Sequence, residues 1–252
     1  MTKIEALLFL LAAGSGTAQF MPGTGWMPGR TPAQMDWWEM LRSPDGWSRA
    51  PDLPSGETVS AARLLHKPPR KARNAFVRAI KLAAANDHVG AAAEFKKAIN
   101  FDPEFSEAHG NLGVEYVRLG RDVESVPEFQ RALQLDPATA LHHANFSYAL
   151  ARLNRLAEAE LEAQTAVSLA PSDPVAQFLL GCLLARNPQT RNFSERHLMV
   201  AAQTLPVAHL ALALVYQDQG AAADAATEMK RYRQSAAHSK ERSPQTAFLP
   251  GQ

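Results

Sequence analysis

The sequence predicts an all-α protein, a solenoid of antiparallel helix pairs that follows an irregular segment rich in proline, glycine and tryptophan. The first observation is a repeat. Pro103, Pro137 and Pro171 are each 34 residues apart, and Pro206 follows 35 residues later. The second observation is that each of these prolines closes a segment whose apolar residues have helical spacing. A period of this length is typical of stacked helical repeats, because one helix pair cannot bury its apolar face alone.

Residues 1–18 have the pattern of a secretory signal peptide. Lys3 precedes an apolar run over residues 6–13, and small residues follow as far as Ala18, where cleavage would fit. The run is much shorter than the roughly 20 apolar residues of a membrane-spanning helix, so we expect no stable membrane insertion. We expect an exported bacterial protein of the periplasm or cell envelope. Glu5 weakens the positive end of the signal, and the alternative is a cytoplasmic protein whose N-terminus is not cleaved.

Residues 19–70 are predicted to be an irregular linker. Eight of the 17 prolines lie between residues 20 and 70, where they interrupt any regular element. The linker also contains all four tryptophans, Trp26, Trp37, Trp38 and Trp47. This is an unusual amount of apolar surface for a solvated segment. We therefore expect these rings to dock on the folded part of the chain.

Residues 71–234 are predicted to form a repeat domain. Five repeats fit the period, with approximate bounds 72–105, 106–139, 140–173, 174–205 and 206–234. The second repeat shows the pattern most fully, through His109, Leu112, Gly113, Tyr116, Ser125, Phe129, Ala132 and Pro137. Its small residues let paired helices approach closely, while its aromatic residue fills the gap between one repeat and the next.

The fourth repeat departs from this pattern. Residues 187–192 lengthen the turn between its helices, and Ser194, Leu198 and Ala201 fall one position later than in the other repeats. Residues 235–252 follow the last repeat and are predicted to be a disordered tail.

The order of side chains in these segments resembles the tetratricopeptide repeat, and the resemblance covers residues 72–234. It implies a right-handed superhelical solenoid in which the first helix of each repeat lines a concave groove. It also implies that the groove binds another protein or a peptide.

The resemblance assigns candidate groove residues to the first helices. They are Asn111, Val114, Arg118, Asn145, Tyr148, Arg152, Phe178 and Arg186, with Phe76, Ile80, Val117, Cys182, Leu210 and Leu214 completing a largely apolar wall. The three arginines are each 34 residues apart and would form a row. Such a row beside an apolar strip suits an extended segment that offers carboxylates and hydrophobic side chains. The open alternative is that each arginine only complements the negative end of its own helix.

Motifs for catalysis are absent from the sequence, which has no glycine-rich phosphate loop, no His-Glu-x-x-His and no Gly-x-Ser-x-Gly. His109, His143 and His209 share one repeat position, where packing is a simpler explanation than a metal site. The single cysteine, Cys182, excludes an intrachain disulfide and a cysteine-rich zinc site. We therefore expect no enzyme activity, no cofactor and no metal.

The charge of the chain does not favour nucleic acid as a partner. The formal net charge is only +1, so there is no overall attraction for a polyanion. A basic run from Arg63 to Lys81 contains no acidic residue and could attract phosphates or an anionic membrane. We expect instead that it is the solvated entry to the first helix, because no series of aromatic residues accompanies it. We expect neither nucleic acid nor a small-molecule ligand.

Taken together, the sequence predicts a non-enzymatic scaffold or adaptor whose groove binds a peptide or protein partner. Two alternatives stay open. In the first, the tryptophan-rich linker occupies the groove of its own chain and partners bind the convex face. In the second, the protein is an accessory subunit of an envelope enzyme or secretion complex.

Overall fold

The computed structural model describes residues 66–187 and 189–242. Within these ranges the chain forms ten helices and no strand: α5 (Arg70–Ala84), α6 (His88–Phe101), α7 (Ser106–Arg118), α8 (Asp122–Leu135), α9 (Ala140–Arg152), α10 (Leu156–Leu169), α11 (Pro174–Arg186), α12 (Arg191–Ala202), α13 (Pro206–Asp218) and α14 (Ala222–Arg242). The predicted all-α solenoid is confirmed. The predicted signal peptide and residues 19–65 of the predicted linker lie outside the described residues.

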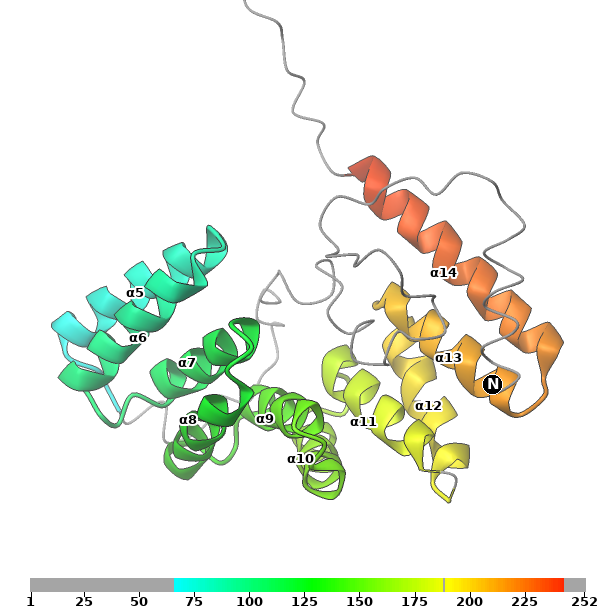
Figure 1. Ribbon diagram of the computed structural model, residues 1–252, viewed down its shortest axis with the longest axis horizontal. Coiled ribbons are helices and arrows are strands. Elements are labelled where there is room, and N and C mark those ends of the chain that lie inside the picture. The colour runs from blue at the N-terminus through cyan, green and yellow to red at the C-terminus, as the bar shows by residue number, and fades with distance from the viewer. Residues whose placement is uncertain (1–65, 188, 243–252) are drawn as a thin grey trace, which may run out of the picture.

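The helices pack as five successive pairs. Figure 1 shows the pairs along an arc, from α5 and α6 at one end to α13 and α14 at the other. Each helix contacts its partner, and the second helix of each of the first four pairs contacts the first helix of the next pair, so that neighbouring pairs share their packing along the array. None of the helices in the described part is both long and apolar enough to cross a bilayer.

Four of the five pairs have the same tight turn between their two helices. One residue of each turn has a positive φ: Asn86 (60°), Gly120 (73°), Asn154 (59°) and Gly220 (79°). Glycine and asparagine adopt this conformation most readily. The equivalent position in the fourth repeat is Pro188, and the ring of a proline fixes φ at about −65°. The fourth repeat therefore cannot use the same turn, which explains why α12 begins one position late, at Arg191.

The displaced second helix of the fourth repeat still packs like the others. Ser194, Leu198 and Ala201 are fully buried, as are Ser125, Phe129 and Ala132 in the second repeat. The longer turn satisfies its own polar groups, because the Thr190 hydroxyl donates to the Leu184 carbonyl at 3.0 Å. The one-residue shift predicted from the sequence is therefore absorbed in the turn.

Glycine in the first helices makes this close packing possible. A Cβ atom on Gly181 would lie 2.7 Å from Cγ of Leu198, and one on Gly113 would lie 2.8 Å from Cε1 of Phe129. Both distances are shorter than any normal carbon contact. The large side chain of the second helix thus occupies the space that a side chain on the first helix would need.

The last helix is longer than the sequence predicted, and one second helix contains a proline. Helix α14 continues to Arg242, so residues 235–242 of the predicted disordered tail are helical. This stretch contains no glycine or proline and can extend the helix. Pro127 is the sixth residue of α8, about one turn into the helix that begins at Asp122, and it leaves the carbonyl of Val123 without an intrahelical donor. Val123 is well exposed, so water can satisfy this carbonyl.

Candidate protein-binding groove

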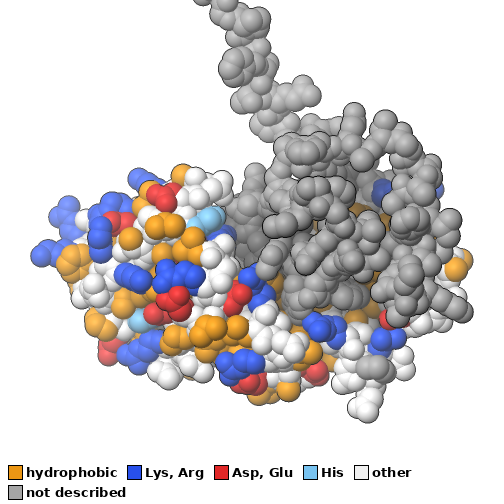
Figure 2. Space-filling view, in the orientation of Figure 1, with side chains coloured by type: hydrophobic (Ala, Val, Ile, Leu, Met, Phe, Trp, Pro, Cys, Tyr) orange, Lys and Arg blue, Asp and Glu red, His pale blue; other side chains and the backbone are white. Residues whose placement is uncertain are grey.

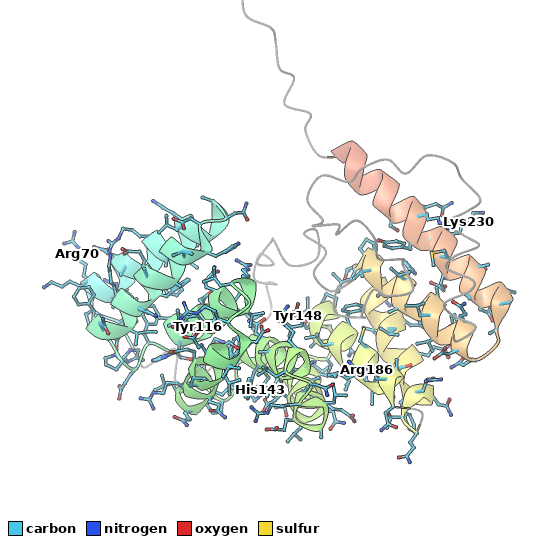
Figure 3. The ribbon with its side chains drawn as sticks, in the orientation of Figure 1. Arg70, Tyr116, His143, Tyr148, Arg186 and Lys230 are labelled. Carbon is cyan, nitrogen blue, oxygen red and sulfur yellow. The ribbon has the colours of Figure 1, made fainter. Side chains whose placement is uncertain are left out.

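The groove predicted from the sequence corresponds to one side of the first helices. We call the apolar side chains larger than alanine at the fifth and ninth positions of the predicted repeats the inner wall: Phe76, Ile80, Val114, Tyr148, Phe178, Cys182, Leu210 and Leu214. Figure 3 shows Tyr148 on the inner side of the arc and His143 on the opposite side, near α10. Residues one repeat apart occupy equivalent places in a solenoid, so the other ninth-position residues are expected to face the same way as Tyr148.

Exposure of the inner wall falls along the array. At the ninth position, Ile80 is 42% exposed and Val114 is partly exposed. The equivalent residues in the last three repeats, Tyr148, Cys182 and Leu214, are only 8%, 4% and 9% exposed. At the ninth position the wall is therefore accessible in the first repeat and covered from the third repeat to the fifth, whereas Leu210, at the fifth position of the last repeat, is partly exposed.

Helix α11 shows this coverage most clearly, because every residue from Ala176 to Ala185 is buried. Apart from Gln177, all of these residues are apolar. A helix that is apolar on all sides is normally covered on all sides. Helices α9, α10, α12 and α13 contact α11. Its inner-wall residues Phe178 and Cys182 are nevertheless buried on the remaining side.

The polar candidates have mixed surroundings. Asn111 and Asn145 are partly buried, and the Asn111 amide donates to the Glu107 carbonyl of its own helix at 2.7 Å. This bond occupies one N–H group and leaves the oxygen of the Asn111 amide as an acceptor. Val114 is partly exposed beside them.

One member of the predicted arginine row, Arg152, forms a contact between repeats. Nε and NH2 of Arg152 donate to the two carboxylate oxygens of Asp122 at 2.7 and 2.8 Å. Its side chain is only 9% exposed, and the guanidinium lies 5.8 Å from the centre of the Tyr148 ring. Burial lowers the pKa of Arg152, but the hydrogen bonds with Asp122 and Tyr148 raise it more, so the net shift is upward. Arg152 is thus a clamp between the third repeat and the second.

Other pairs of neighbouring repeats are joined by different charged side chains. Between the first and second repeats, Nδ1 of His88 lies 2.7 Å from the buried carboxylate of Glu115. The same carboxylate accepts a hydrogen bond from the guanidinium of Arg118 at 3.0 Å. Between the fourth and fifth, the charges are reversed: Arg191 begins the second helix and pairs with Asp218, at the end of α13, at 3.1 Å. These pairs strengthen the structural explanation of the arginine row. Arg186 is exposed at the C-terminal end of α11.

A second set of polar contacts ties each first helix to its own second helix. Nδ1 of His109, His143 and His209 lies 2.7, 2.6 and 2.6 Å from the carboxylates of Glu128, Glu162 and Glu228. Nε2 of His109 and of His143 lies 3.1 Å from a proline carbonyl six residues earlier. The fourth repeat substitutes Gln177, which bonds to His197 and to the Pro171 carbonyl. These contacts explain the shared histidine position without a metal.

Other groups in the described part also favour a packing role. No cluster of three or more histidine, cysteine, aspartate or glutamate side chains there could hold a metal ion. Complete burial raises the pKa of the Cys182 thiol, which keeps it protonated and unreactive.

Two shallow grooves lie between successive second helices, on the other side of the array. One has a floor formed by Phe146 and Leu150 between α8 and α10, and the other a floor formed by Leu180 and Leu184 between α10 and α12. Leu161 on α10 is 62% exposed beside the first groove. The outer grooves were not predicted from the sequence, because each is lined by side chains from three different helices.

Comparison with known families supports the repeat assignment. The tetratricopeptide-repeat family model matches residues 106–139, the second predicted repeat. A comparison with curated proteins finds no match to the sequence.

Solved structures share this fold over about two thirds of the chain. MamA 41-end from Desulfovibrio magneticus RS-1 superposes with a TM-score of 0.58 at 18% identity, covering 67% of this chain and 96% of MamA. PilW, a widely conserved type IV pilus biogenesis factor, gives 0.61 at 24% identity, covering 67% and 79%. YrrB, a tetratricopeptide-repeat protein with an unusual peptide-binding site, gives 0.53 at 20% identity, covering 68% and 92%. The resemblance seen in the sequence is therefore confirmed at the level of the fold.

Proposed function

Because this chain is a tetratricopeptide-repeat protein, we propose that it is a non-enzymatic scaffold that binds a polypeptide against the inner wall of its third to fifth repeats. The observation that carries the proposal is the apolar character of this wall. Tyr148, Phe178, Cys182 and Leu214 form a strip with no charged member, along helices whose other sides pack within the solenoid. A strip of this kind gains free energy only when it is covered.

The expected ligand is an extended segment with large apolar side chains. Its side chains would pack on the strip, and its backbone could bond to Asn111 and Asn145 at the edge of the wall. Because Arg152 is engaged with Asp122, carboxylates on the partner are a weaker requirement than the sequence indicated. YrrB, which shares the fold, is described as having an unusual peptide-binding site. That description supports polypeptide binding as the general role proposed for this chain.

We also propose a cellular setting, on the sequence of residues 1–18 alone: an exported adaptor of the bacterial envelope. PilW, a type IV pilus biogenesis factor, shows that the same fold occurs in an envelope assembly. An accessory subunit of an envelope enzyme or secretion complex is one form that such an adaptor could take.

A matched pair of variants tests the binding wall. Partners crosslinked in the native cell would be identified by mass spectrometry and their affinity for the purified full chain measured. Leu214→Glu places a charge in the apolar strip, whereas Leu161→Glu places the same charge on the exposed ridge of α10. We expect Leu214→Glu to weaken binding about tenfold or more and Leu161→Glu to leave it unchanged. The opposite pattern would reject the inner wall and favour the outer grooves.

The outer grooves are the second candidate surface. They are supported by the exposure of Leu161 and Phe193, two large apolar side chains beside hollows of about 500 and 440 Å³. If partners bind there, loss of affinity in Leu161→Glu would show it in the same experiment.

A further inference from the structure

At its ninth positions, the inner wall is buried from the third repeat to the fifth, although it is partly exposed in the second. In the described part of the chain, the helices adjoining α11 contact its flanks, yet Phe178 and Cys182 are only 4% exposed. Ile80 has the equivalent position in the first repeat and is 42% exposed. Part of this difference reflects the end position of the first repeat, but Val114 of the second repeat has neighbouring pairs on both sides and is also partly exposed. The contrast between Val114 and the buried Tyr148 and Cys182 therefore favours additional cover beyond the second repeat.

We propose that this cover is the tryptophan-rich segment of the same chain, residues 20–65, bound as a resident occupant of the inner wall. The inference rests on the proposed function, because it treats the same wall as a polypeptide-binding surface, and it adds that the chain carries its own competing ligand. Partner binding would then require displacement of this segment.

The composition of the segment matches the surface. It contains Trp26, Trp37, Trp38 and Trp47 together with Phe20, Met21, Met27 and Met35. The wall offers apolar side chains at successive repeats, and the charged group of Arg152 beside Tyr148 is already paired with Asp122. Burying aromatic rings on the wall would remove apolar area from water on both sides, at about 25 cal/mol for each Å².

Length and attachment also allow the contact. The described chain begins at His66, whose Nε2 lies 2.8 Å from the buried Asp102 carboxylate at the end of α6. The segment thus starts at the junction of the first and second repeats. An extended chain spans up to about 3.3 Å for each residue, so some twenty residues reach along about 60 Å. Residues 20–65 are long enough to follow the wall from the second repeat to the fifth.

A segment held within the same chain is favoured over a second copy by concentration. A tethered ligand is present at an effective concentration in the millimolar range when its linker is short and flexible. A separate chain must reach that concentration in solution to compete. Residues 20–65 of the same chain therefore bind the wall in preference to the same segment of a second copy.

The sequence provides one reporter on each side of the proposed contact. All four tryptophans lie in residues 20–65, and the repeats contain none, so intrinsic fluorescence reports on the segment alone. Cys182 is the only cysteine and belongs to the wall, so its reaction with an aromatic disulfide reports on the wall alone. Both signals come from native side chains of the full chain, so no substitution is needed to introduce a probe.

The test compares the wild type with Leu214→Glu and Leu161→Glu. In the wild type we expect tryptophan emission at shorter wavelength than in the urea-unfolded chain, weak quenching by iodide, and a Cys182 reaction at least about tenfold slower than in urea. Leu214→Glu should shift the emission to longer wavelength and speed the thiol reaction while helicity is retained. Leu161→Glu should change neither.

Three outcomes would overturn the proposal. They are water-exposed emission in the wild type, identical emission and reactivity in the two folded variants, and protection that disappears on dilution, which would identify a second copy as the cover. If circular dichroism shows that Leu214→Glu does not fold, Tyr148→Gln takes its place. Partner affinity is a separate measurement, so the proposed function and this occupant can fail independently.

Discussion

A histidine bridge recurs at the residue scale in three of the five repeats. In the second and third repeats the ring faces a carboxylate on one side and a carbonyl on the other. At His143 the two acceptors are satisfied together only when both ring nitrogens carry a proton, which is the imidazolium form. The fourth repeat achieves the same bridge with Gln177, whose amide supplies one donor and one acceptor and does not titrate.

His143 should therefore make stability depend on pH. Burial lowers its pKa, but the hydrogen bonds with Glu162 and the Pro137 carbonyl and the charge of Glu162 outweigh burial, so the pKa is raised from 6.5. Its contribution to folding is full below the unfolded pKa and is lost as pH rises through the higher folded value. The free energy of unfolding, measured with urea, should therefore fall less for His143→Gln than for the wild type as the pH rises from about 5 to about 9.

His197 supplies an internal contrast for this experiment. Burial and the charge of Arg196 lower its pKa, so its contribution has the opposite sign: it is present above the unfolded pKa and lost as pH falls through the folded value. His197→Gln should lose less stability than the wild type on acidification. An unchanged pH profile for His143→Gln would remove the charged bridge from the explanation.

The buried clamp of Arg152 gives a second prediction at this scale. Arg152→Ala leaves the Asp122 carboxylate without its partner in a half-buried site and should lower the free energy of unfolding by about 2 kcal/mol. Arg155→Ala breaks the exposed pair between Arg155 and Glu158, which solvent screens, and should lower the free energy of unfolding much less than Arg152→Ala does. Denaturant titration of both variants checks this. Equal costs would mean that Arg152 does not hold the repeats together.

The sequence could predict some of these contacts and not others. Glu128, Glu162 and Glu228 each follow their histidine by 19 residues, so the same periodic comparison that found the histidines could have found their partners. The partners of the arginine row could not be found in this way. Arg118 bonds to Glu115 of its own helix and Arg152 to Asp122 of the preceding repeat, whereas the last junction uses Arg191 and Asp218, which lie outside the row. Only the assembled junctions show these differences.

At the scale of the helix pair, small residues in the first helix set the distance between its two members. Gly181 lies against Leu198, and a Cβ there would come within 2.7 Å of it. Gly181→Val should therefore force the helices apart and destabilise the protein by about 1–3 kcal/mol. Thermal and urea unfolding measure the change. A variant as stable as the wild type would contradict this, because it would show that α11 and α12 leave room for a side chain at position 181.

Helix positions were well predicted because period, small residues and prolines all fall in phase. The late start of α12 was also visible in the sequence, and the structure supplies its cause in the positive-φ turn that Pro188 cannot make. The end of α14 was wrongly predicted. No stop signal precedes Pro244, so a repeat boundary at 234 was not a helix boundary.

At the scale of the whole molecule, the five pairs form one continuous array whose inner wall is apolar. The sequence could predict which helix positions belong to the wall, because equivalent positions recur in every repeat. Its unequal exposure did not, because the accessibility of a position depends on what covers the array and not on the repeat itself. The outer grooves beside α10 likewise arise only when helices from different repeats are brought together.

Processing of the N-terminus is a prediction at the same scale. If residues 1–18 are a signal peptide, the mature protein purified from its own cell should begin at Gln19. Intact-mass measurement and N-terminal sequencing decide this. A mature chain that retains residues 1–18 would contradict export and place the adaptor in the cytoplasm.

Photocrosslinking from the wall tests the account most directly. A photoreactive amino acid would replace Leu214 in one variant of the full chain and Leu161 in another, and crosslinked peptides would be identified by mass spectrometry after irradiation. The account predicts polypeptide crosslinks from position 214, to residues 20–65 in the isolated protein and to the partner when it is bound, with none from position 161. Crosslinks that form only from position 161 would contradict it.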